Sequence, residues 1–311
     1  MVSSSRGFEE EAVKFKVTGI LYEYDTILLL FVFIGHTQAD VPWSSHLAKC
    51  AGQEISKGKN MTICVDTVDN KHDGPCHSAL TMKPYPHLYV KPVFRPDFYN
   101  CIMSHIPPSS ITERVYNRLP NDRYQLTIQG KYFGPGKKRN PKIPTRSRHF
   151  WNDFAVAFGG EAMVRLWLEK FDVTLRYRQF SYRDAPKAFY YSFDIGRDKR
   201  GYEIGPHTDT MDKWVTTLYY LPRSAAQSSA GTCVVKSKSG KTDNGRSRGR
   251  LGGDFTVARK AAFVPNAVFA FAACDKSWHA VQSYKGAITR DTIQGFVKSQ
   301  KHSGKGKCGG E

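Results

Sequence analysis

The stretch GPHTDTMDKWVTTLYYLP, residues 205–222, decides how the rest of the chain is interpreted. His207 and Asp209 are two residues apart, so at the end of an extended strand their side chains point to the same side. A second histidine, His279, follows on a later segment, in SWHAVQ. Two imidazoles and one carboxylate on one face of an octahedron form the facial triad that holds Fe(II) and leaves the other face open. These three residues are therefore candidate metal ligands.

An accidental HxD is the competing interpretation, because the chain contains ten histidines and a short motif alone is weak evidence. The surrounding sequence favours a site. The run from Trp214 to Leu221 is rich in β-branched and aromatic residues and closes at Pro222, which predicts a buried strand. Short strands separated by turns, with no helical periodicity between them, predict an antiparallel jelly roll or barrel. Further strand segments are predicted at 261–273, with a turn at Pro265-Asn266, at 279–284 and at 290–297.

Residues 188–298 resemble the double-stranded β-helix core of the Fe(II)/2-oxoglutarate-dependent oxygenases, and within them the prolyl-4-hydroxylase-like branch. The matching pieces occur in the family's order: HTD, VTTLYYLP, the Gly231-Thr232 pair, FVPNAVFAF, WHAV and RDTIQGF. The resemblance implies a mainly β fold with supporting helices (α+β), a double-stranded β-helix or jelly roll. It also implies that His207, Asp209 and His279 bind Fe(II) and form the catalytic centre.

The same resemblance implies a site for the co-substrate 2-oxoglutarate. Arg290, eleven residues after His279, matches the basic residue that pairs with the 5-carboxylate. A guanidinium suits that role because its planar fork matches a carboxylate. Tyr220 corresponds to a tyrosine that hydrogen-bonds the same carboxylate, and Thr292 adds a hydroxyl. For Tyr220, a core aromatic with a satisfied hydroxyl is an equally good interpretation.

The carboxylate at position 209 favours hydroxylation, because related halogenating enzymes carry a small residue there. The implied enzyme is a dioxygenase that converts 2-oxoglutarate to succinate while hydroxylating a C–H bond of a small molecule or a peptidyl, prolyl-type substrate. Ascorbate is the implied reductant. Desaturation and ring closure by the same chemistry stay open. The alternative is a non-catalytic, cupin-like jelly-roll module that binds an anionic ligand.

The predicted organisation has three parts. Residues 82–300 form the oxygenase domain, with helical support over 82–187 and the jelly-roll core over 188–300. Residues 301–311 are expected to be a basic flexible tail. Within the support, the pattern predicts a strand at 87–93, a helix at 96–106 that begins with its proline, and two amphipathic helices between 150 and 171, separated by Gly159-Gly160.

Residues 1–81 carry no periodic pattern and are expected to be an extension of unknown role, dispensable for the core reaction. Their apolar run, 27–34, is too short to span a bilayer, which needs about 20 residues. As a signal peptide it would follow glutamates where positive charge is usual, so a cytoplasmic location is favoured over secretion. The seven cysteines include no CxxC pair, which argues against a disulfide framework. The cluster His72, Cys76 and His77 lacks a fourth zinc ligand and is predicted to be a solvated loop.

The net charge of +18 implies attraction to anionic ligands or surfaces. Basic residues gather in three runs, at 137–148, 236–250 and 298–307. The second run interrupts the jelly roll and is predicted to be a solvated, poorly ordered loop; a loop beside the mouth of the site is the alternative. The basic runs lack interleaved aromatic residues, so nucleic-acid readout is not expected. The predicted partner is a small-molecule or peptide substrate, with anionic character favoured by this charge, and no membrane span.

Overall fold

The computed structural model gives backbone and side chains for eight ranges of the chain and the backbone alone for four further strands. Every described residue belongs to the second of two compact units, Ile34–Glu311. The fully described residues are 80–108, 144–176, 178, 188–243, 245, 247–284, 289–299 and 306–308; the backbone-only strands are 37–41, 61–65, 113–114 and 123–127.

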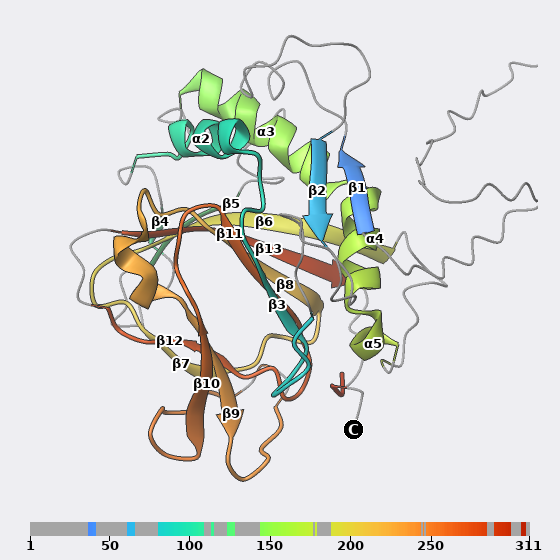
Figure 1. Ribbon diagram of the computed structural model, residues 1–311, viewed down its shortest axis with the longest axis vertical. Helices are drawn as coiled ribbons and strands as arrows, with labels where there is room; N and C mark the ends of the chain where they lie inside the picture. Colours follow the sequence, from blue (N-terminus) through green and yellow to red (C-terminus); the bar gives the residue numbers. More distant parts are fainter. Residues whose placement is uncertain are drawn as a thin grey trace, which may run out of the picture. The chain divides into compact units, whose positions relative to one another are not determined.

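Eight strands, β6 to β13, form two sheets in the pattern of a jelly roll (Figure 1). All neighbouring strands within both sheets are antiparallel. The large sheet holds them in the order β11-β8-β13-β6, and the small sheet in the order β10-β9-β12-β7. The chain therefore passes repeatedly between the sheets, which confirms the predicted double-stranded β-helix. The strands are β6 (Phe189–Asp198), β7 (Ile204–His207), β8 (Lys213–Tyr220), β9 (Thr232–Ser237), β10 (Phe255–Ala261), β11 (Ala267–Ala272), β12 (His279–Val281) and β13 (Arg290–Ser299).

Three N-terminal strands extend the large sheet at its two edges. Strand β3 (His87–Val90) pairs with β11, so the predicted strand at 87–93 exists but ends earlier. At the opposite edge, β5 (Arg123–Thr127) pairs with β6, and β4 (Glu113–Arg114) pairs with β5. The support region thus contributes strands to the sheet as well as the helices that were expected.

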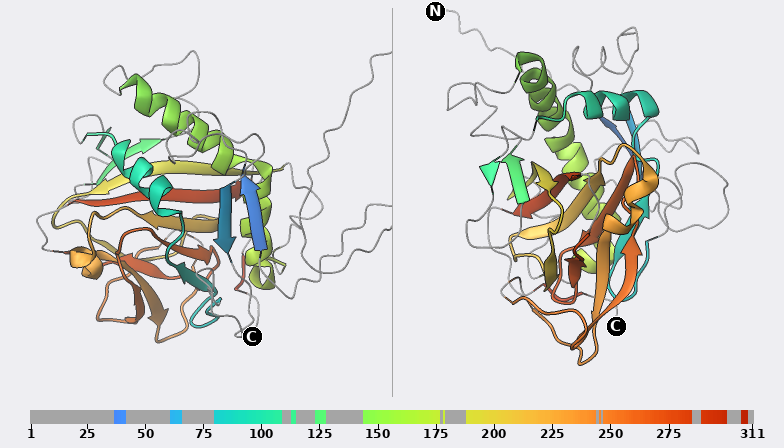
Figure 2. Two further views of the ribbon diagram at one scale, coloured as in Figure 1. Left: turned by 45° about the horizontal axis from the view of Figure 1, so that its top comes forward. Right: turned by 90° about the vertical axis from the view of Figure 1, so that its left-hand side faces the viewer.

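The helices α2 (Pro96–Ser104), α3 (Thr145–Gly159) and α4 (Glu161–Lys170) lie on one side of the large sheet (Figure 2). Helix α2 begins with Pro96, whose fixed φ suits the first helical position. Gly160 separates α3 from α4, as predicted. Aromatic residues at helical spacing on α3 pack into the core between helices and sheet, and two of their rings stack with centroids 4.2 Å apart, those of Phe154 and Phe158. Two short helices complete the set: α5 (Asp172–Leu175) and the 3₁₀ helix η3 (Ala225–Ala230).

The region preceding residue 82 contains regular structure that the sequence pattern did not predict. Strands β1 (Thr37–Val41) and β2 (Met61–Val65) pair antiparallel in a separate two-stranded sheet, and β1 contacts α4. The apolar run 27–34 and the cluster His72, Cys76 and His77 lie outside the described residues. That residues 1–81 are dispensable stays a prediction. Across the part of the chain that the structure describes, no helix has the length and apolarity needed to cross a bilayer.

A disulfide joins Cys274 to Cys308 with the Cα atoms 5.2 Å apart, and Cys101 is also disulfide-bonded. The expectation that the cysteines form no disulfides is therefore wrong. Spacing could not reveal this bond, because its two cysteines are 34 residues apart and only the folded chain brings them together. The expected flexible tail also differs at Gly306–Cys308: the Asp275 N–H donates to the Gly306 carbonyl, and the Cys308 N–H donates to the Asp275 carboxylate.

Candidate metal and co-substrate site

The candidate site lies on the face of the large sheet that looks toward the small sheet. Because side chains alternate along a strand, β13 directs Arg290, Thr292 and Gln294 to this inner face and Ile293 to the helix-covered outer face. The packing agrees with the alternation. Ile293 belongs to the apolar core beneath the helices, whereas Tyr220 of β8, directly opposite Thr292, packs in the smaller cluster between the sheets.

The two predicted histidine ligands come together across the small sheet. His207 ends β7, His279 begins β12, and the two residues are direct partners in the ladder. Their ring centroids are 4.2 Å apart. Each Nδ1 lies within hydrogen-bond distance of the carbonyl oxygen two residues earlier, at 2.8 Å to Gly205 and 3.0 Å to Ser277. A carbonyl only accepts, so each Nδ1 carries the proton and each Nε2 presents a lone pair, which is the arrangement of a metal-binding histidine.

The surroundings of His207 and Asp209 shift the pKa of each side chain. Burial, together with the neighbouring His279, lowers the pKa of His207 to about 3, so its imidazole is neutral at physiological pH. Burial alone would raise the pKa of Asp209, but Lys213 and the two histidines outweigh it and hold that pKa well below its usual range. A neutral imidazole beside an ionised carboxylate is the donor set that Fe(II) requires.

Asp209 follows β7 and is held by two neighbours. The Lys213 ammonium lies 2.6 Å from one carboxylate oxygen, and the Thr216 hydroxyl donates to the other. Among the described residues, the ligand-type atoms that all lie within 4.8 Å of one another belong to Cys274, Asp275 and Cys308, not to His207, Asp209 and His279. Two of those three are the disulfide sulfurs, so that cluster is no metal site. Convergence of the predicted triad on one ion stays a prediction.

Arg290 is buried and bridges the two sheets. Its Nη1 donates to the Asp198 carboxylate at 2.8 Å, its Nε to the Ala230 carbonyl at 2.7 Å, and its Nη2 to the Thr232 hydroxyl at 3.1 Å. A guanidinium carries five N–H groups, so these three bonds leave donor capacity on both terminal nitrogens. The two terminal nitrogens are the ones that a carboxylate engages in a bidentate pair.

Tyr220 and Thr292 lie beside this guanidinium. The Arg290 guanidinium carbon is 5.7 Å from the Tyr220 ring centroid, and the Tyr220 hydroxyl accepts from the Thr232 N–H at 3.2 Å. Thr292 lies opposite Tyr220 in the sheet and accepts from the Gln294 amide at 3.3 Å. The structure thus brings together the three residues predicted to hold 2-oxoglutarate. Their role in binding stays a prediction.

Strand β9 shows how near the histidine pair and the arginine cluster lie to each other. His279 is opposite Val234 of β9, and Arg290 donates to Thr232, two residues earlier on the same strand. Residues two apart share a face and are separated by roughly 7 Å. Both clusters therefore lie at the same face of β9.

The basic loop 236–250 is tied to the HTD segment. The Thr208 hydroxyl donates to Asp243, and the Gly249 N–H donates to the Pro206 carbonyl at 2.6 Å. Gly245 has a positive φ of 76°, and a Cβ there would lie 2.6 Å from the Asp209 carbonyl oxygen, so glycine is required on both counts. Of the two interpretations of this loop, the contacts favour the one that places it beside the site.

Three residues of the site were missed by sequence reasoning. Asp198 pairs with Arg290, Lys213 pairs with Asp209, and the buried Tyr85 has a hydroxyl with no hydrogen-bond partner among the described residues. The pKa of Tyr85 is raised by burial first and then by the charge of Asp209, which places its phenol near the candidate ligands. The acidic end of β6 was a weak signal for Asp198. Tyr85 lies more than a hundred residues before His207, and no local pattern connects them.

Comparisons with known proteins give matches in structure alone. No protein-family model matches the chain, and no curated protein matches its sequence. A prolyl-4-hydroxylase from Pseudomonas putida is similar over 69% of this chain and 93% of its own, with 8% identity and a TM-score of 0.42. An oxidoreductase of the 2OG-Fe(II) oxygenase family from Burkholderia pseudomallei is similar over 71% of this chain and 87% of its own, with 14% identity and a TM-score of 0.39. Function is therefore inferred from the residues of this chain.

Proposed function

We propose that this chain is an Fe(II)- and 2-oxoglutarate-dependent dioxygenase that hydroxylates a C–H bond of a small molecule or a peptidyl, prolyl-type substrate. The observation that carries the proposal is the pair His207 and His279, whose ring centroids lie 4.2 Å apart and whose Nδ1 atoms both donate to backbone carbonyls. That arrangement costs conformational freedom and suits metal binding, because a ligating histidine usually donates its other N–H to such an acceptor.

In the proposed enzyme, His207, His279 and Asp209 hold Fe(II). Arg290 orients 2-oxoglutarate through its terminal nitrogens, with Tyr220 and Thr292 beside it. Iron and 2-oxoglutarate, when bound, supply the oxidising chemistry, in which dioxygen is consumed, 2-oxoglutarate yields succinate and carbon dioxide, and the substrate gains a hydroxyl. The apolar residues between the sheets limit the access of water. Ascorbate is the proposed reductant.

Metal binding requires Asp209 to release one of its present partners. The Lys213 ammonium occupies one carboxylate oxygen, and a divalent cation would displace it by its greater charge. The displaced Lys213 ammonium could keep its cation–π contact with Phe296, whose ring centroid lies 3.8 Å away. Thr216 can stay hydrogen-bonded to the other oxygen and fix the orientation of the carboxylate.

The test is succinate release from 2-oxoglutarate by the full chain with Fe(II), in air, with prolyl peptides and free amino acids as substrates. The wild type should release succinate and His279→Ala should not. Asp212→Asn is the matched control, because Asp212 lies three residues after Asp209 and bonds Thr210 and Lys298 instead of the histidines. Loss of activity in the control as well would contradict the assignment.

One observation favours a second candidate, a non-catalytic jelly-roll module for an anionic ligand. Both oxygens of Asp209 are engaged by side chains, and Arg290 has its own carboxylate partner in Asp198. Such a module would bind no metal through the histidines. Equilibrium dialysis with Co(II) separates the candidates, since the proposed enzyme should bind one ion that His279→Ala abolishes.

A further inference from the structure

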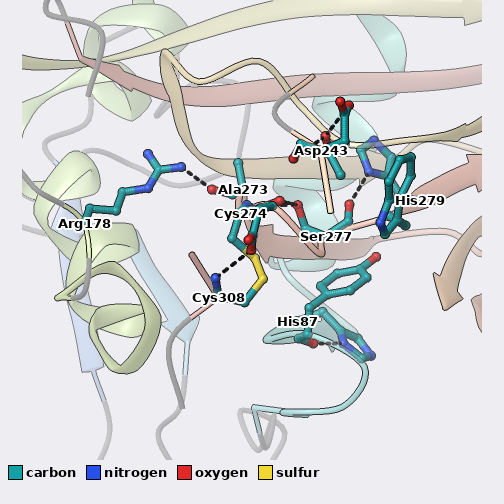
Figure 3. Close-up of a disulfide and its surroundings, with 12 residues drawn as sticks. His87, Arg178, Asp243, Ala273, Cys274, Ser277, His279 and Cys308 are labelled. Atoms are coloured by element: carbon teal, nitrogen blue, oxygen red, sulfur yellow. Dashed lines mark hydrogen bonds between the residues drawn. A yellow bond between two sulfur atoms is a disulfide. The ribbon is translucent and has the colours of Figure 1, made fainter. Parts of the chain in front are cut away.

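A cavity of about 580 Å³ lies apart from the predicted metal ligands and co-substrate residues. It is bounded by the segment leading into β3, the end of β9 with the loop that follows, and the turn before β12. Cys308 closes one side, held there by its disulfide to Cys274 (Figure 3). Its volume lies within the range of small-molecule sites, about 300 to 1,000 Å³.

The cavity is lined by four lysines and no carboxylate. Lys83, Lys236 and Lys241 are exposed, Lys276 is half-buried, and the fourteen lining residues include neither Asp nor Glu. Lys236, near the end of β9, and Lys241 belong to the basic run 236–250, so part of the charge that the sequence concentrates there lines a concave surface. Four lysines around one hollow raise the local concentration of anions. Lysines act as point charges and suit the oxygens of phosphates and carboxylates.

Two buried aromatic residues line the inner end of the cavity. Trp278 is one of them, and its side chain faces away from the candidate metal ligands, because adjacent residues of a strand alternate between faces and His279 follows it. Tyr85 is the other; it is 1% exposed and packs against Phe271, whose ring in turn lies 4.6 Å from that of His279. The Tyr85 hydroxyl has almost no accessible surface, so the lysines supply the charged contacts that the cavity offers.

We propose that this cavity binds an anionic ligand, a group that carries two or more phosphate or carboxylate charges. The lysines bind and orient the charged group. None of the predicted metal ligands or co-substrate residues lines the cavity, so the proposal does not depend on the proposed function.

The test measures binding by calorimetry on the full chain, without iron or 2-oxoglutarate. Pyrophosphate and tricarballylate are the two probes, and the tighter one shows whether phosphate or carboxylate oxygens are preferred. The double variant Lys236→Met/Lys241→Met should weaken binding by tenfold or more. Lys238→Met/Lys260→Met is the matched control, because it removes the same charge from residues that do not line the cavity, and it should bind as the wild type does.

Two results would overturn the proposal: no binding of either probe, or equal weakening in both double variants. Equal weakening would mean that the overall charge of the protein attracts the anions. Because the measurement needs no turnover, its outcome is separate from the succinate assay. A chain that binds pyrophosphate through Lys236 and Lys241 but releases no succinate would contradict the proposed function and leave an anion-binding cavity.

Discussion

The two faces of the large sheet are made from alternate residues of the same strands, yet they differ in chemistry. Toward the helices, β8 and β13 present Val215, Tyr219, Ile293 and Val297, which join one continuous apolar core. Toward the small sheet, β13 presents three buried polar residues, Arg290, Thr292 and Gln294. Arg290 donates to Asp198, and Gln294 donates to Thr292. Polar burial is costly unless it is paired, so the inner face contributes less to stability than the outer face. The difference suggests that one face holds the fold and the other holds the proposed chemistry.

The largest expected effect is the loss of succinate formation when a residue of the inner face is replaced. Asp209→Ala should reduce succinate formation to background, because the carboxylate neutralises part of the metal charge and fixes the open face of the site. The melting temperature of this variant should fall, because the Lys213 ammonium loses its carboxylate partner, so activity is compared at a temperature at which both proteins are folded. Full activity in Asp209→Ala would contradict the assignment of the active site to the inner face of the sheet.

Arg290 forms a buried ion pair and is also the proposed anchor for 2-oxoglutarate. A double variant is needed to separate its effect on stability from its effect on binding. Arg290→Met alone leaves the buried Asp198 carboxylate without its guanidinium partner, which should cost about 3–5 kcal/mol in the free energy of unfolding. Arg290→Met with Asp198→Asn removes both charges and should recover most of that stability. Its KM for 2-oxoglutarate should still rise about 10- to 150-fold, because a charge-assisted pair contributes about 1.5–3 kcal/mol. Metal affinity should change far less, and equal loss of both would indicate a structural arginine.

The adjacent residues Thr292 and Ile293 compare the faces directly. Ile293→Ala should lower the free energy of unfolding by about 2–5 kcal/mol, since the side chain is fully buried beneath the helices. Its KM for 2-oxoglutarate should not change while the protein is folded. Thr292→Val keeps the shape and removes the hydroxyl, so KM should rise severalfold. Denaturant titration measures the stability of both variants, and succinate kinetics measure their KM for 2-oxoglutarate. A raised KM in Ile293→Ala together with a large loss of stability in Thr292→Val would contradict the assignment of the two faces.

Tyr85→Phe should separate stability from function in a single residue. Removal of the unpaired buried hydroxyl should raise the free energy of unfolding by about 1 kcal/mol or leave it unchanged. Turnover should not change, because the hydroxyl has almost no accessible surface and touches no substrate. A variant that is both less stable and fully active would show that the hydroxyl has a structural partner.

The smallest effect concerns pH. Burial lowers the pKa of His87, whose Nδ1 donates to the Tyr85 carbonyl at 2.8 Å. The unfolded chain therefore takes up a proton near pH 6.5 that the folded chain takes up only at lower pH, so stability falls as the pH drops below about 6.5. In His87→Gln the loss between pH 7 and 5 should be smaller. Urea titrations at these two pH values measure it, and an unchanged loss would assign it to other groups.

The sequence by itself determined the order of the strands and most of the candidate ligands. Alternation and turn residues located β8, β11, β12 and β13 within a few positions, since these patterns report which residues must be buried. The HTD motif, His279 and Arg290 were identified from short segments, and the helices were located by the spacing of their aromatic residues. Each of these signals is local, so it can be detected without the fold.

Only the tertiary structure decided what faces these residues. The pairing of Asp198 with Arg290, of Lys213 with Asp209, and of Cys274 with Cys308 joins positions whose proximity no local pattern encodes. The position of Tyr85 and the enclosure of four lysines around one cavity arise in the same way. A strand pattern shows which side of a sheet a residue takes, because side chains alternate with a period of two. Which distant side chain meets it across the sheets depends on how the whole chain packs.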